Sequence, residues 1–230
     1  MAMIYSKEPC KSAGTFTTNL VKAAPVKWDK NQVTSGADAQ AVIINAGIAN
    51  ACTGEEGMGY CAQTAKAAAE TLGVAEDGVL VASTGVIGMQ IPVDKITAGI
   101  KKLVAAKADT LEAGSDAAHA IMTTDTVRKE CAYELQLSTG TVKIGAMAKG
   151  SGMIHPNMAT MLVYVTTDAK ADPADLQKML SAAVDKSFNM CTVDGDTSTN
   201  DSIFLLANGA SGVEIKTEED KKAMADLVLA

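Results

Sequence analysis

The feature that most limits the fold is an alternation along the chain between short apolar runs and longer segments with helical periodicity. Residues 41–45, 78–82, 161–165 and 203–206 are apolar runs bounded by turn residues, which predicts buried strands. Between the first two runs, residues 55–72 repeat apolar side chains at helical spacing and end at a glycine, which predicts a helix. Strands that alternate with helices in this way indicate a mixed α/β fold.

The remaining segments complete this pattern. Further strands are predicted at 3–5, loosely at 15–21 before Pro25, and as a hairpin of 131–137 with 142–148. Further helices are predicted from capping residues, and they are expected to begin after Pro92, at Ser115 (running through Met122), at Asp172-Pro173 and at Thr217, which has Asp220 three positions later. The sequence therefore predicts an α/β fold of layered, mixed sheets covered by helices.

Size, composition and charge narrow the class of protein. A chain of 230 residues can bury a substantial core, and 47% hydrophobic residues with 3% aromatic residues suit helices packed closely on a sheet. The net charge is −7 and the basic residues are scattered, so no nucleic-acid surface is predicted. No apolar run approaches the roughly 18 residues of a membrane span, and no signal-peptide pattern is present. We expect a cytoplasmic protein without a membrane partner.

The sequence offers no recognisable metal or nucleotide site. The five cysteines are an odd number without a C-x-x-C pair, which argues against a disulfide framework or a zinc site. The run from Asp194 resembles a calcium loop, but it has Thr199 where a glycine is needed and Leu205 where a glutamate is needed. No dinucleotide or Walker A motif occurs. We therefore expect no metal and no bound cofactor, and we expect side chains of the 193–201 loop to hydrogen-bond backbone near the active centre.

The candidate nucleophile is Thr160. A threonine hydroxyl is a weak nucleophile without an adjacent base, and a threonine at the start of a chain can use its own α-amine as that base. An internal threonine reaches this state only if the bond before it is cut. The glycines of the loop 149–160 and the small Ala159 are compatible with such a cut, and the next strand would hold Thr160 rigidly. These features also fit an ordinary loop that leads into a strand. His155, in the same loop, is predicted to pack the loop rather than to act in catalysis.

Four sequence motifs favour the nucleophile over an ordinary loop as the interpretation of Thr160. They are Lys149–Val163 (KGSGMIHPNMATMLV), Ala46–Gly54 (AGIANACTG), Ser83–Gly88 (STGVIG) and Val193–Asp201 (VDGDTSTND). Together they closely resemble segments of the ornithine acetyltransferase (bifunctional glutamate N-acetyltransferase) family of arginine biosynthesis. The resemblance covers essentially the whole chain. It implies helices over paired sheets, as in the N-terminal-nucleophile hydrolases.

The resemblance also implies roles for individual residues. The precursor would cut itself between Ala159 and Thr160, and Thr160 would then carry acetyl from N-acetylornithine to glutamate. Thr84 and Gly85 match the oxyanion hole of the family, while Thr123 and Lys149 match residues that contact the amino-acid substrate. Either of the neighbouring threonines, 123 or 124, fits that pattern. Some members of the family also accept acetyl-CoA, and the sequence leaves this co-substrate open.

The resemblance predicts the organisation of the chain as well. Residues 1–159 would form the first subunit segment, and residues 160–230 would form the start of the second. The second segment is shorter than that of the family, so we expect a truncated member, shortened at both ends. The two pieces are expected to stay associated, and the family implies a heterotetramer. Two departures from the family pattern are Ile48 in place of asparagine and Met190-Cys191 in place of Arg-Ile.

Two alternatives remain at this stage. A self-cleaving aminopeptidase or amidohydrolase of similar fold would release its product without an acceptor. An inactive, truncated remnant would fold cooperatively but would form no acyl intermediate on Thr160.

Overall fold

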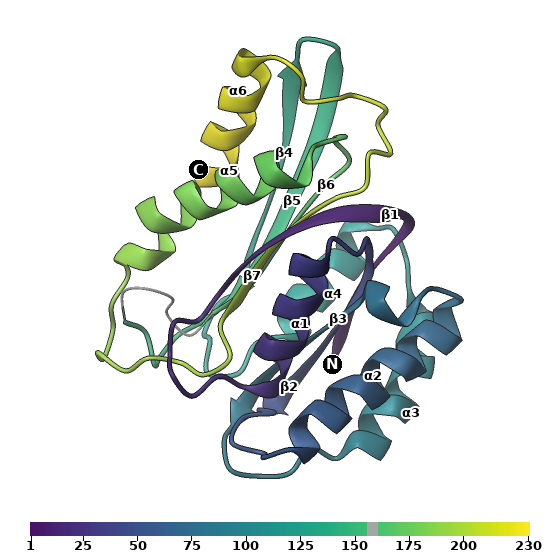
Figure 1. Cartoon of the computed structure of the whole chain (residues 1–230), viewed down its shortest axis with the longest axis vertical. Coiled ribbons are helices and arrows are strands. Elements are labelled where there is room, and N and C mark those ends of the chain that lie inside the picture. Colours follow the sequence, from purple (N-terminus) through teal and green to yellow (C-terminus); the bar gives the residue numbers. More distant parts are fainter. Residues whose placement is uncertain (156–160) are drawn as a thin grey trace.

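The strands form one mixed sheet in the computed structural model, which describes residues 1–155 and 161–230 (Figure 1). Within these residues the sheet has seven strands, in the order β3-β2-β1-β7-β6-β5-β4. Their bounds are β1 (Ala2–Phe16), β2 (Ala39–Ile48), β3 (Val79–Val86), β4 (Lys129–Leu137), β5 (Gly140–Lys149), β6 (Leu162–Thr167) and β7 (Ser202–Ala207). The β2–β3 and β6–β7 pairs are parallel, and the other neighbours are antiparallel. The predicted hairpin is confirmed as β4 and β5.

The long strand β1 joins the two halves of the sheet. Its first part pairs with β2, with a break in register between Tyr5 and Cys10, and residues Lys11 to Phe16 pair with β7. The two strands predicted near the start are thus parts of one. The strand predicted over 15–21 is wrong beyond Phe16, because the chain leaves the sheet there.

Six α-helices cover the sheet in the described parts of the chain. They are α1 (Ala24–Ser35), α2 (Glu56–Leu72), α3 (Val93–Ala106), α4 (Leu111–Ala120), α5 (Pro173–Lys186) and α6 (Glu218–Leu229), with short 3₁₀ turns η1 (Glu76–Gly78) and η2 (Phe188–Met190). The sequence interpretation missed α1 because it took Pro25 as the end of a strand. Here the proline stands in the first turn of a helix, where its fixed φ is favourable. The start predicted at Ser115 is wrong, since Thr110 caps α4 by accepting the N–H of Ala113.

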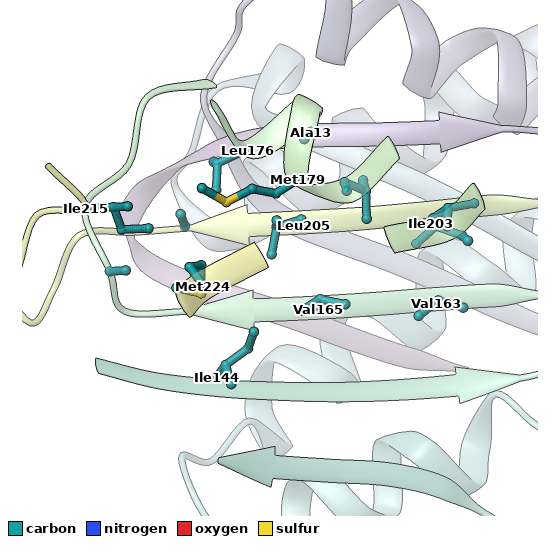
Figure 2. Close-up of a cluster of buried hydrophobic side chains, with 14 of the residues drawn as sticks. Ala13, Ile144, Val163, Val165, Leu176, Met179, Ile203, Leu205, Ile215 and Met224 are labelled. Carbon is teal, nitrogen blue, oxygen red and sulfur yellow. The ribbon is translucent and has the colours of Figure 1, made fainter. Parts of the chain in front are cut away.

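The molecule has four layers, which are a layer of helices, the two halves of the sheet, and a second layer of helices. Three apolar clusters lie between these layers. Helices α5 and α6 lie over one half of the sheet, and α1, α2 and α3 lie over the other (Figure 1). In the first outer cluster, Val163 and Val165 of β6 and Leu205 of β7 face Leu176 of α5 and Met224 of α6 (Figure 2). Each such side chain contributes about 1.5–3 kcal/mol through its removal from water.

The middle cluster lies between the two halves of the sheet. It joins Val42 and Ile44 of β2 to Tyr164 of β6 and Phe204 of β7, and the rings of Tyr164 and Phe204 stack with centroids 6.0 Å apart. The alternate residues of β2, among them Ile43, face the helices instead. Both faces of these strands are buried, which explains their uninterrupted apolar sequences. The predicted layered α/β fold is confirmed, and its paired sheets are two halves of one sheet that share β1.

The start of α5 offers a local test of the fold. The carboxylate of Asp172 accepts the N–H of Ala174 at 2.8 Å, as the Asp-Pro start predicts. We expect Asp172→Ala to lower the free energy of unfolding by about 1 kcal/mol, because a helical N–H loses its acceptor. Urea denaturation measures this change. Asp172→Asn keeps an acceptor oxygen and serves as the control, and an equal loss in both variants would contradict the capping role.

Candidate active site

Two of the predicted motifs lie side by side at the carboxyl ends of β2 and β3. The parallel register pairs Ala46 with Thr84 and Gly47 with Gly85. The hydroxyl of Ser83 accepts the N–H of Asn50 at 2.8 Å, which fastens the following loop to β3. The motifs at 46–54 and 83–88 therefore form one structural unit at this edge of the sheet.

Gly85 lies against Gly47 of the neighbouring strand. Its φ is +133°, a conformation that favours glycine. A Cβ atom built there would lie 2.2 Å from the carbonyl carbon of Gly47 and 2.6 Å from the nitrogen of Ile48. No side chain fits this space, so the glycine is required by the backbone around Thr84.

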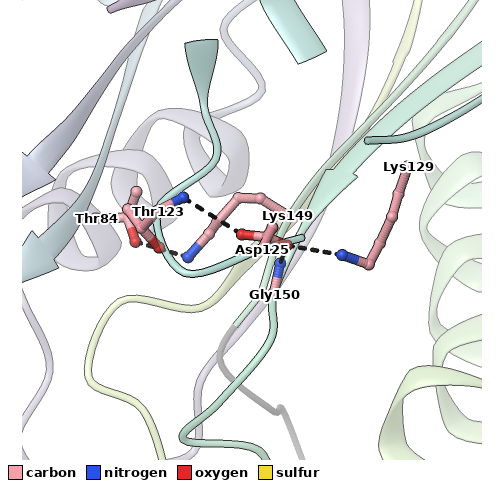
Figure 3. Close-up of polar contacts among 6 residues, drawn as sticks. All are labelled: Thr84, Thr123, Asp125, Lys129, Lys149 and Gly150. Atoms are coloured by element: carbon pink, nitrogen blue, oxygen red, sulfur yellow. Dashed lines mark hydrogen bonds and ion pairs between the residues drawn. The ribbon is translucent and has the colours of Figure 1, made fainter. Parts of the chain in front are cut away.

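Lys149 reaches the same place from the end of β5. It is only 3% exposed, and its Nζ donates a hydrogen bond to Oγ1 of Thr84 at 3.1 Å (Figure 3). Burial lowers the pKa of Lys149, and Lys129 adds to this, while the carboxylates of Asp125 and Asp201 act in the opposite direction. A buried cation beside a hydroxyl is suited to bind a carboxylate or to stabilise a developing negative charge.

Asp125 organises the loop that carries Thr123. Its Oδ1 accepts hydrogen bonds from Lys129 Nζ at 2.7 Å and from the N–H of Gly150 at 2.8 Å, and Oδ2 accepts the N–H of Thr123 at 3.3 Å (Figure 3). Burial would raise the pKa of Asp125, but these hydrogen bonds outweigh it and hold the pKa below its usual value. The loop after α4 is thus tied to the segment that follows Lys149.

The loop before β7 closes the opposite side. Nδ2 of Asn200 donates to the carbonyl of Ser83 at 2.9 Å, and the carbonyl of Ser198 accepts the hydroxyl of Thr17. The next residue, Asp201, is 1% exposed and accepts the N–H of Met161 at 3.0 Å. Burial raises the pKa of Asp201 to about 8, although Ser198, the Met161 N–H and Lys149 act to lower it. The expectation that this loop hydrogen-bonds backbone near the centre is confirmed.

These segments line an open pocket, or cavity, of about 730 Å³. It is lined by residues 46–47, 84–87, 122–124, 149 and 198–200, among others. The predicted residues Thr84, Gly85, Thr123 and Lys149 therefore all face one space, and Thr124 lines it as well. The predicted cleavage residues Ala159 and Thr160 lie outside the described residues.

Sequence reasoning missed several residues of this site. The hydrogen bonds that link Asp125 to Gly150, Asn200 to Ser83 and Asp201 to Met161 emerge only from the fold, because each joins residues that stand 25 or more positions apart. His155 is exposed, so the prediction that it packs the loop is wrong. The five cysteines are free, and no group of three His, Cys, Asp or Glu side chains in the described ranges could hold a metal ion. No helix in those ranges is long and apolar enough to cross a bilayer.

Comparison with known proteins identifies the family of the chain. The model of the ArgJ family matches residues 1–230. The chain belongs to the ArgJ family. The arginine biosynthesis bifunctional protein ArgJ of Symbiobacterium thermophilum is 57% identical over 212 residues, which are 92% of this chain and 52% of that protein. The ArgJ of Thermotoga neapolitana is 45% identical over 222 residues, or 96% of this chain and 55% of that protein. The chain thus spans about half the length of these curated ArgJ relatives.

Solved structures of ArgJ proteins share the fold. The ArgJ of Bacillus halodurans superposes with a TM-score of 0.65 at 44% identity, covering 68% of this chain and 81% of that one. The ornithine acetyltransferase of Mycobacterium tuberculosis, complexed with ornithine, gives 0.61 at 40% identity, covering 67% and 81%. An L-aminopeptidase D-Ala-esterase/amidase of Ochrobactrum anthropi, an Ntn-hydrolase-fold variant, gives 0.56 at 14% identity, covering 96% and 71%, which shows the fold alone. The resemblance noted from the motifs is confirmed as family membership.

Proposed function

We propose that this chain carries the acyl-transfer centre of an ArgJ acetyltransferase, which moves acetyl from N-acetylornithine to glutamate. The observation that carries the proposal is that Thr84, Gly85, Thr123 and Lys149 line one cavity, next to the strand that begins after Thr160. Family membership and the ArgJ relatives named above support the reaction class. The reaction needs no metal, and acetyl-CoA remains open as a second acetyl donor.

The first step is self-cleavage between Ala159 and Thr160. Thr160 Oγ attacks the carbonyl carbon of Ala159, and the oxygen that becomes negative is stabilised by Thr84 and Gly85, with Lys149 behind the Thr84 hydroxyl. The peptide C–N bond breaks and leaves an ester on Oγ and a free α-amine. Water then hydrolyses the ester, which frees the hydroxyl and a new carboxylate on Ala159. The amine of Thr160 is then available as the base for its own hydroxyl.

Acetyl transfer repeats the same chemistry in two halves. Thr160 Oγ attacks the acetyl carbonyl of N-acetylornithine, and the C–N bond breaks. Ornithine leaves, and the acetyl group stays on Thr160 as an ester. The amine of glutamate attacks that ester, forms N-acetylglutamate and restores the hydroxyl. Lys149, with Thr123 at the rim of the same cavity, binds a substrate carboxylate.

The order of strands in the sheet supports our proposal that the two pieces remain together. We propose that they do so in a soluble, cytoplasmic enzyme. Strands β6 and β7 follow the cleaved bond, and they lie between β1 and β5, which precede it. The pieces 1–159 and 160–230 would thus share two strand pairings and the middle apolar cluster. We propose that such paired pieces assemble further into a heterotetramer.

The intact mass of the purified protein under denaturing conditions tests this proposal. We expect two species that sum to 23.6 kDa plus one water, the smaller beginning at Thr160. We expect Thr160→Ala to give a single uncleaved species, because it lacks the nucleophile. Incubation with N-acetylornithine should then add the mass of one acetyl group to the 160–230 piece. Cleavage in Thr160→Ala would contradict the proposal, and release of free acetate without transfer would favour the hydrolase alternative.

A further inference from the structure

The 193–201 loop forms hydrogen bonds with the chain just before residues 156–160. The carboxylate of Asp194 accepts the N–H of Met153 at 2.6 Å on Oδ2 and the N–H of Ile154 at 2.9 Å on Oδ1. The N–H of Val193 donates to the carbonyl of Ile154 at 2.9 Å. Met153 has φ +58°, which is unfavourable for a residue with a side chain. The hydrogen bonds to Asp194 hold this conformation in place.

The same loop grips the chain on the downstream side. Oδ1 of Asp201 accepts the N–H of Met161, and the N–H of Ser202 donates to the carbonyl of Met161 at 3.3 Å. No described residue meets the geometry of a hydrogen bond to the other oxygen of Asp201, Oδ2, which is buried, although the Ser198 side chain acts on this carboxyl group and lowers its pKa. A half-satisfied buried carboxyl is costly. Its retention here is explained if its contact with Met161 serves a purpose beyond packing.

Covalent geometry connects this contact to the bond that would be cut. The N–H of Met161 belongs to the planar peptide group that also contains the carbonyl and Cα of Thr160. A group that fixes this N–H therefore fixes the orientation of that plane. The Asp194 contacts fix the chain a few residues before the same bond.

We propose that the 193–201 loop is a two-sided clamp, in which Asp194 and Asp201 are positioning residues for self-cleavage between Ala159 and Thr160. The clamp fixes the chain at Met153 and Ile154 on one side and at Met161 on the other, and we expect this to favour the attack of Thr160 Oγ on the Ala159 carbonyl. After cleavage, the Asp201 contact would still hold Met161 at the head of β6. The role in cleavage rests on the proposed function, whereas the clamp itself is testable without cleavage.

Amide hydrogen exchange tests the clamp in the uncleavable Thr160→Ala protein. We expect Asp201→Ala to speed the exchange of the Met161 amide about tenfold or more, and Asp194→Ala to do so for Met153 and Ile154, because each amide loses its acceptor. Asp201→Asn keeps an acceptor oxygen and should restore protection to within about threefold. Asp196→Ala is the matched control, since it removes an exposed carboxylate from the same loop and should change none of these amides.

The rate of cleavage, followed by intact mass in the Thr160 protein, tests the positioning role. Asp201→Ala and Asp194→Ala should cleave about tenfold more slowly or worse, while Asp201→Asn and Asp196→Ala should cleave at nearly the wild-type rate. Asp194 is exposed, so its variant decides the question if Asp201→Ala fails to fold. Normal cleavage in a folded Asp194→Ala protein would overturn the proposal. A wild-type protein that does not cleave would refute self-cleavage, and amide exchange that is unchanged in the variants would then overturn the clamp.

Discussion

Gly85→Ala is expected to cost the protein about 4 kcal/mol of its free energy of unfolding. The new methyl group would overlap the Gly47 carbonyl, whose oxygen lies 2.3 Å from the position that a Cβ atom would take, and φ +133° is strained for alanine. Backbone atoms cannot rotate away, so the parallel pairing of β2 with β3 must open at its carboxyl end. A domain with about 5–15 kcal/mol of stability would lose a large part of it. Chemical denaturation followed by circular dichroism measures the loss.

The control for this variant is another glycine that lacks both constraints. Gly114 lies inside α4, and a Cβ there meets nothing within 4 Å. We expect Gly114→Ala to raise the free energy of unfolding by up to about 1 kcal/mol, because alanine favours a helix. If Gly85→Ala were as stable as the wild type, the close approach of the two strands would be contradicted.

Lys149→Met is expected to remove most of the affinity for glutamate while leaving the fold intact. Methionine has a similar volume, and its uncharged side chain avoids the cost of burying a cation in a position that is 3% exposed. We therefore expect the free energy of unfolding to change by less than about 2 kcal/mol. The substrate carboxylate, however, would lose a buried cationic partner, and affinity should fall about 100-fold. Titration calorimetry with glutamate measures the change. Lys143→Met, which replaces an exposed lysine on the same strand, should leave the affinity unchanged.

The same pair of proteins makes a prediction about pH. Because burial lowers the pKa of Lys149 in the folded state, the unfolded chain holds this proton to a higher pH than the folded chain does. Stability of the wild type should therefore rise, relative to Lys149→Met, as pH increases from the folded pKa towards the ordinary value of 10.5. Thermal unfolding of both proteins between neutral and alkaline pH measures this difference. Parallel curves would show that folding leaves the pKa of Lys149 unchanged, which would contradict the lowered pKa.

The parts of the fold that sequence predicted are those set by local chemistry. The apolar runs of β2, β3, β6 and β7, the Asp172-Pro173 start of α5 and the Thr217 cap of α6 all appear in the structure. Helix α1 was missed because its average hydrophobicity is low and Pro25 fits either a strand end or a helix start. The full length of β1 also escaped prediction, because its pairing with β7 brings together residues that are nearly 200 positions apart.

In the candidate site, too, some features were predicted from the sequence and others were not. Thr84, Gly85, Thr123 and Lys149 were predicted through motif resemblance, and the fold brings all four to one cavity. The hydrogen bonds of Asp125 were not predicted, and those of Asn200 were predicted only for the 193–201 loop as a whole, without their partners. Their importance depends on which strands end at the same edge of the sheet.

The strand β1 also sets the order of events during folding. Its last six residues pair with β7, so the sheet closes only after the chain has been made as far as β7. Pairings between distant parts of a chain form slowly. The cavity needs the ends of β3 and β5 together with the loop before β7, so it exists only once this closure is complete. If the bond before Thr160 is cut as proposed, the chain cannot cut itself prematurely, and a cut protein is by this fact one that has already folded.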